Sequence, residues 1–180
     1  MIFRLFRLCL PRARLLQMLC AVVLLTACSP SYNWREIVVA DGHATAAFPA
    51  RVQTETRTIT LNGETLSFTL TSAQVNKALF AIGSAPLPEE IARDPAAREA
   101  LGQAVMRSLY VNLGAQAPPS LPDFGDEIVA RGHMGQQPGW LMARVWVTDT
   151  MLIDAVAAGT DQDLPLEHAQ EFVRSVKLHR

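Results

Sequence analysis

The feature that most limits the fold is an Asn62-Gly63 pair set between two stretches in which polar and apolar residues alternate. Asn-Gly favours the tight type I′ turn, whose twist matches that of two antiparallel strands. Alternation with a period of two indicates strands that are buried on one face only. The pattern therefore predicts a β-hairpin over 54–71, with a further strand over 77–84 beside its second arm.

The hydrophobic period changes to four residues after Asp94-Pro95. Asp is a good N-cap, and Pro is tolerated in the first helical turn. We therefore expect a helix from Pro95 to Gly114 that packs on the sheet through one stripe, formed by Ala97, Leu101, Val105, Leu109 and Leu113. The alternation and turn signals predict further strands over 34–39, 44–48, 126–133, 139–147 and 151–157, and a last helix from Pro165.

A three-residue loop, Thr148–Thr150, is expected to join the last two long strands. This loop would place Arg144 opposite Asp154, and it would leave both faces of the pair apolar except for that ion pair. A sheet that is apolar on both faces needs cover on both. We therefore predict an α+β fold, in which an antiparallel sheet of about six strands is sandwiched by helices.

The first 27 residues have a different character. Four arginines and no acidic residue accompany an apolar run, Leu15–Leu25, which is short for a membrane-spanning helix. The run ends in Leu25-Thr26-Ala27-Cys28, which resembles the bacterial lipobox. The resemblance implies a signal peptide over 1–27 that forms an N-terminal signal helix. It also implies lipidation of Cys28 by acyl chains such as palmitate, a tether over 28–33 and one domain over 34–180.

Charge and cysteine content agree with this division. Without the leader the chain keeps 12 basic and 17 acidic side chains, so we expect no nucleic-acid partner. Cys9 and Cys20 would leave with the leader, and Cys28 would carry lipid, so no disulfide is expected. Ser29 resembles the residue that follows the cysteine in outer-membrane lipoproteins. The alternative is an uncleaved single-pass inner-membrane protein.

Three further features carry a family resemblance. They are Phe48-Pro49-Ala50-Arg51 before the first hairpin, the Asn-Gly turn with the helix after it, and the closing segment 171–178. Together they resemble small uncharacterised lipoproteins of Gram-negative bacteria with a PsbP/Mog1-like domain. That resemblance implies an accessory or binding subunit, and it supplies no catalytic residues to carry over.

The sequence contains no recognisable catalytic, metal or cofactor motif. The histidines have no metal-pair spacing, and no serine lies in a nucleophile elbow. An acidic cluster, Asp123, Asp126 and Glu127, does not have the spacing of a calcium loop. We therefore predict a protein that is not an enzyme and holds neither metal nor cofactor. A small envelope hydrolase with a dispersed triad is the alternative.

The best candidate for a binding face is an aromatic strand, formed by Trp140, Met142, Arg144 and Trp146 together with Asp154. It would offer a groove for an apolar ligand or a peptide, unless the last helix covers it. The hypothesis is a membrane-anchored domain facing the periplasm, at the outer rather than the inner membrane. Its role would be non-catalytic, and its partners would be the bilayer, through acylated Cys28, and an envelope protein or peptide.

Overall fold

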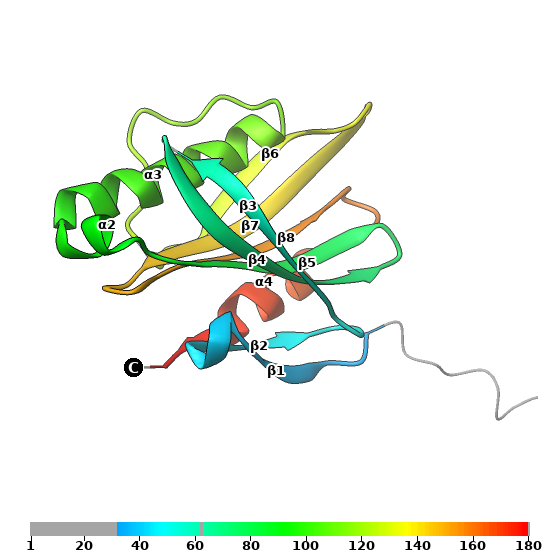
Figure 1. Cartoon of the computed structure of the whole chain (residues 1–180). Helices are drawn as coiled ribbons and strands as arrows, with labels where there is room; N and C mark the ends of the chain where they lie inside the picture. Colours follow the sequence, from blue (N-terminus) through cyan, green and yellow to red (C-terminus); the bar gives the residue numbers. More distant parts are fainter. Residues whose placement is uncertain (1–31, 62, 180) are drawn as a thin grey trace, which may run out of the picture. The chain divides into compact units, whose positions relative to one another are not determined.

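The computed structural model describes residues 32–61 and 63–179 (Figure 1). The predictions for the leader, for Cys28 and for Asn62 lie outside these residues. One compact unit runs from Tyr32 to Arg180, so it begins two residues before the expected boundary. Its elements are β1 (Arg35–Val39), a 3₁₀ turn η1 (Ala40–Gly42), β2 (Ala44–Phe48), β3 (Gln53–Leu61), β4 (Glu64–Val75), β5 (Ala78–Pro86), α2 (Glu89–Arg93), α3 (Pro95–Asn112), β6 (Ile128–Met134), β7 (Gln137–Val147), β8 (Met151–Gly159), α4 (Leu166–Ser175) and β9 (Lys177–Leu178).

The predicted antiparallel sheet of six strands is confirmed. Its order is β3-β4-β5-β8-β7-β6, and every neighbouring pair is antiparallel. The hairpin around position 62 has the expected register, with Leu61 opposite Glu64, and β5 lies beside its second arm. A second, three-stranded sheet has the order β1-β2-β9.

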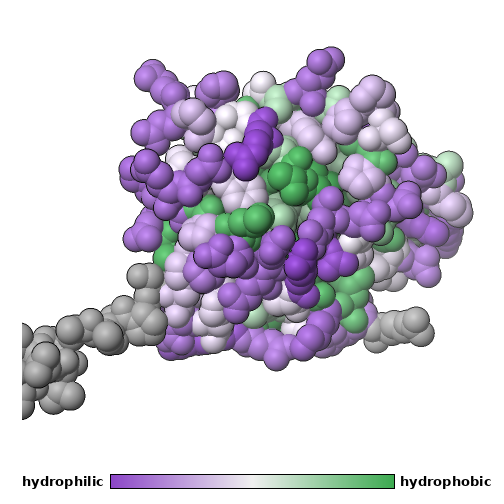
Figure 2. Space-filling model, turned by 180° about the vertical axis from the view of Figure 1, so that it is seen from behind, coloured by the Kyte–Doolittle hydropathy of each residue, from purple (hydrophilic) through white to green (hydrophobic). Residues whose placement is uncertain are grey.

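Each face of the large sheet is covered by its own layer (Figure 1). On one face α3 buries four of the five residues in its predicted stripe, with Leu101 only 1% exposed. On the other face α4 and the small sheet enclose a second core, in which Phe172 is fully buried. Seen from behind, the surface is mostly polar around a limited apolar area (Figure 2), because the large apolar side chains are divided between these two cores.

The expected register between β7 and β8 is wrong by one residue. Val147 lies opposite Leu152, and Val145 lies opposite Asp154. The Thr148 N–H donates to the Met151 carbonyl at 2.8 Å, so the loop contains two residues, Asp149 and Thr150, and not three. A slip of one residue moves every side chain of a strand to the other face, and Asp154 is therefore on the face opposite Arg144.

The sequence patterns did not predict three short elements: the 3₁₀ turn η1, helix α2 and strand β9. Helix α2 follows Pro88, and an ion pair between Glu89 and Arg93 joins its two ends. Strand β9 has only two residues, too few to show alternation, and it pairs with the start of β2. None of the helices in the described part of the chain is long and apolar enough to cross a bilayer.

Candidate functional site

The predicted aromatic face is a covered surface. Trp140, Met142, Arg144 and Trp146 lie on the same face of β7, because they are two residues apart along one strand. Trp140 and Met142 are 3% and 2% exposed, and they belong to the core that α4 and the small sheet close. The part of this face around Trp140 and Met142 is therefore covered, whereas Arg144 and Trp146 at its edge are only partly buried.

Arg144 joins three parts of the domain from the edge of this face. Its guanidinium lies over the Trp146 ring, 4.8 Å from the centroid. Its Nε donates to the Gly125 carbonyl at 2.6 Å, and its Nη1 donates to the Val173 carbonyl at 3.5 Å. Val173 lies in the last turn of α4, where a cation stabilises the negative end of the helix dipole. Arg144 thus links the loop before β6, the sheet and α4.

Asp154 is separate from that set, and its buried carboxyl group has no ionic partner among the residues that the structure describes. It is 7% exposed, and within the described residues its Oδ1 accepts no hydrogen bond. Burial raises the pKa of Asp154 to about 7, because the charged form loses its hydration. The opposite residue on β5 is Gly83, where an added Cβ would lie 2.3 Å from Oδ1 and 2.3 Å from the Phe68 ring. Glycine at 83 therefore provides the space that the carboxyl group occupies.

The acidic side chains of the sequence cluster have different surroundings, although the Asp126 N–H donates to the Asp123 carbonyl at 3.1 Å. Glu127 accepts two hydrogen bonds from Arg174 of α4, at 2.6 and 3.2 Å. This bond holds the pKa of Glu127 below its usual value. Asp123 lies in the wall of a cleft. No group of three or more His, Cys, Asp or Glu side chains among the described residues is placed to hold a metal ion.

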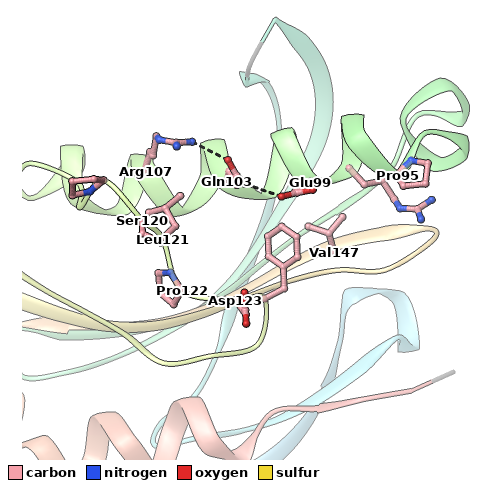
Figure 3. A pocket seen from close by; sticks show the side chains of 12 residues that line it. Pro95, Glu99, Gln103, Arg107, Ser120, Leu121, Pro122, Asp123 and Val147 are labelled. Atoms are coloured by element: carbon pink, nitrogen blue, oxygen red, sulfur yellow. Dashed lines mark hydrogen bonds between the residues drawn. The ribbon is translucent and has the colours of Figure 1, made fainter.

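The cleft is formed by α3 and the segment 119–124, and it has a volume of about 580 Å³ (Figure 3). The wall on α3 is polar: Arg107 donates to Gln103 at 3.4 Å, and Gln103 donates to Glu99 at 3.0 Å. The opposite wall is mainly apolar. It consists of Pro119, Leu121, Pro122 and Phe124 together with Ser120 and Asp123, and Val147 of β7 also lines the cleft.

A glycine in α3 sets the width of this cleft. An added Cβ at Gly102 would lie 2.5 Å from the Phe124 ring and 2.6 Å from Val147, so glycine lets both side chains rest against the helix. Arg98 fixes the N-terminal end of the cleft through an ion pair with Asp149 at 3.3 Å and a hydrogen bond to the Ala92 carbonyl. The cleft is therefore held by packing on one side and by an ion pair at one end.

Sequence reasoning missed the cleft because its second wall has no regular structure. Segment 120–125 shows neither a helix nor a strand period, and the polar face of α3 carries no motif. Two signals were present in the chain. Gly102 lies within a helix, where glycine costs up to about 1 kcal/mol, and Pro118-Pro119 stiffens the segment that returns along α3.

Comparison of the chain with protein-family models, with curated proteins and with solved structures gives no significant match.

Proposed function

We propose that this chain is a lipid-anchored envelope protein whose domain binds a partner and performs no chemistry itself. The observation that carries the proposal is Leu25-Thr26-Ala27-Cys28 at the end of an arginine-flanked apolar run. Lipidation at Cys28 would leave three residues before Tyr32, and Tyr32 already packs in the domain, with its ring stacked 3.7 Å from that of His168. Three extended residues span only about 10 Å, so the anchor would hold the domain close to the bilayer.

Within this proposal, the α3 cleft is the binding site for an extended segment of an envelope protein. Its volume is that of a typical ligand site. The side-chain amide of Gln103 can both donate and accept hydrogen bonds, as a peptide backbone requires. The opposite wall, with Leu121 and Phe124, offers apolar contact for alternate side chains of the segment.

We also propose the PsbP/Mog1-like type for the fold and the outer membrane for the location. The first is supported by the antiparallel sheet with α3 on one face and α4 on the other. The second is supported by Ser29 after the cysteine.

One experiment with two readouts tests the anchor and the site. Cells expressing the full chain are grown with a radiolabelled fatty acid, and a photo-crosslinking amino acid replaces Gln103. We expect label on the protein in the outer-membrane fraction and none on the Cys28→Ala variant, whereas Cys20→Ala keeps the label on the mature protein. Label that persists in Cys28→Ala, or no label at all, would contradict the anchor.

The crosslinker reports on the cleft in the same cells. We expect a discrete adduct from position 103 that Arg107→Glu reduces, because reversing the charge changes the polar wall of the cleft. A crosslinker at Glu64, an exposed position at the start of β4, is the matched control. Equal amounts of adduct from positions 64 and 103 would contradict the cleft as the binding site, and this result would not bear on the lipid anchor.

A further inference from the structure

Strand β3 forms a long free edge of the six-stranded sheet. Among the described elements it pairs only with β4, so alternate N–H and C=O groups along its other side point away from the sheet. The opposite edge, β6, differs, because the N–H of His133 donates to the Leu113 carbonyl at the end of α3, at 2.7 Å. No backbone hydrogen bond of this kind reaches Gln53–Leu61 in the described part of the chain.

The sequence of β3 carries few of the features that protect such an edge. Proteins protect edges with proline, charged side chains (above all lysine) or a bulge; Gln53–Leu61 contains no proline, lysine or glycine, and its two charged residues, Glu55 and Arg57, have opposite signs. Threonine occupies every second position, and all residues from Gln53 to Thr58 are exposed. Thr54 and Thr56 already form cross-strand hydrogen bonds with threonines of β4, at 3.1 and 2.9 Å.

We propose that β3 pairs antiparallel with β3 of a second copy of this chain, about a two-fold axis at Thr56. In this register Glu55 lies opposite the second copy's Arg57, and Arg57 lies opposite the second copy's Glu55. Opposite charges directly across a strand pair are favourable, and like charges are unfavourable. An axis one residue later would place Arg57 opposite Arg57, and an axis one residue earlier would place Glu55 opposite Glu55. Charge thus selects the axis at Thr56.

The threonines fit the same register. Thr56 would meet Thr56, and Thr54 would meet Thr58, which extends outward the threonine ladder that joins β3 to β4. Among the described residues, the ion pair of Glu55 and Arg57 with each other is the only one that either forms, and both side chains are more than half exposed. A two-fold axis perpendicular to the sheet keeps both α3 layers on the same side. The result is one continuous sheet of two copies, an association that goes beyond the proposed function.

Charge-reversal variants of the full chain, purified in a mild detergent, test this pairing by sedimentation. We expect the wild-type chain to dimerise. We expect Glu55→Arg and Arg57→Glu each to raise the dimer dissociation constant about tenfold or more, because each creates two like-charge pairs across the axis. Both side chains are exposed, so neither change alters the core.

Two rescues make the test specific to the register. The double variant Glu55→Arg/Arg57→Glu has complementary charges again and dimerises like the wild type. An equal mixture of the two single variants forms a heterodimer, because arginines on one strand then face glutamates on the other. Arg93→Glu, which reverses a comparably exposed charge in an ion pair of α2, is the control and leaves association unchanged.

Three outcomes would overturn the proposal. The first is a wild-type chain that stays monomeric up to about 100 μM, a range in which even weak dimers are populated. The second is undiminished association of the single variants. The third is failure of the mixture to re-associate, which would show that some other surface joins the copies.

Discussion

At the scale of single residues, Asp154 is the group most sensitive to solution conditions. It lies in the middle of β8, on the same face as Val145, with the backbone of Gly83 beside it. No cation is bonded to its carboxyl group among the described residues, and desolvation raises its pKa from 3.8 to about 7. The folded protein therefore holds a neutral carboxylic acid at mildly acidic pH.

Stability is expected to fall as the pH rises from about 4 to above 7. Between these values the folded state binds a proton at Asp154 that the unfolded state has released, so the free energy of unfolding decreases with pH. The loss is on the order of 4 kcal/mol for a shift of this size. Urea unfolding of the wild type and of Asp154→Asn across this range measures it, because the difference between the two isolates this carboxyl group.

The Asp154→Asn variant tests the direction of this pH dependence. Asn has the same shape and no charge, so Asp154→Asn should match the wild type near pH 4 and exceed it in stability at pH 8. A difference between the two proteins that does not change with pH would refute the neutral buried acid.

At the scale of secondary-structure elements, the turn between β7 and β8 decides which side chains meet. The Thr148 hydroxyl accepts hydrogen bonds from the N–H groups of Met151 and Thr150, at 2.9 and 3.3 Å. These bonds satisfy donors of the turn that otherwise have no partner within it. They stabilise the two-residue loop and, with it, the register of both strands.

Replacing Thr148 with Val removes that acceptor without changing the size of the side chain. We expect Thr148→Val to lower the free energy of unfolding by about 1–2 kcal/mol, since the turn N–H groups lose their partner. Thr150→Val is the matched control, because Thr150 is exposed and no side-chain bond of its hydroxyl is described. Chemical denaturation measures both, and equal effects would mean that the hydroxyl of Thr148 does not hold the turn.

The turn between β7 and β8 illustrates which parts of the fold the sequence predicts and which it does not. Strand and helix positions follow from local patterns such as Asp94-Pro95, where the Asp94 carboxylate does accept from the Ala96 N–H at 2.9 Å. The register of β7 and β8 depends on the Thr148 hydroxyl, which stabilises the two-residue loop between them. The alternation of polar and apolar residues does not reveal this bond. The cleft depends on an irregular segment folding back on α3, which is a tertiary contact without a period.

At the scale of the whole domain, two cores share one sheet. Side chains alternate along the central strands, so neighbouring residues of β8 belong to different cores: Ile153 to the α4 side and Leu152 to the α3 side. The sheet itself separates the two cores. Each core is completed by a different helix, and the backbone between them is common to both.

This division predicts which pairs of core substitutions are additive. Ile82→Val and Ile128→Val each delete a methylene from a different core, and each should cost about 0.5–1.5 kcal/mol. Their sum should hold in the double variant within about 0.5 kcal/mol, because they share no contact. Ile82→Val with Ile153→Val, in one core, is the comparison and should depart from the sum. Urea unfolding checks both pairs, and coupling across the sheet as strong as within one core would contradict the division.

The fit of Gly83 against Asp154 has a consequence for how this chain can evolve. Glycine at 83 cannot be replaced while Asp154 and Phe68 stay, since an added Cβ would meet both the carboxyl oxygen and the Phe68 ring. A lineage that loses the acid at 154 frees only part of this space, because alanine at 83 would still meet the Phe68 ring. Descendants of this chain should therefore keep glycine at 83 until both 154 and 68 carry smaller side chains.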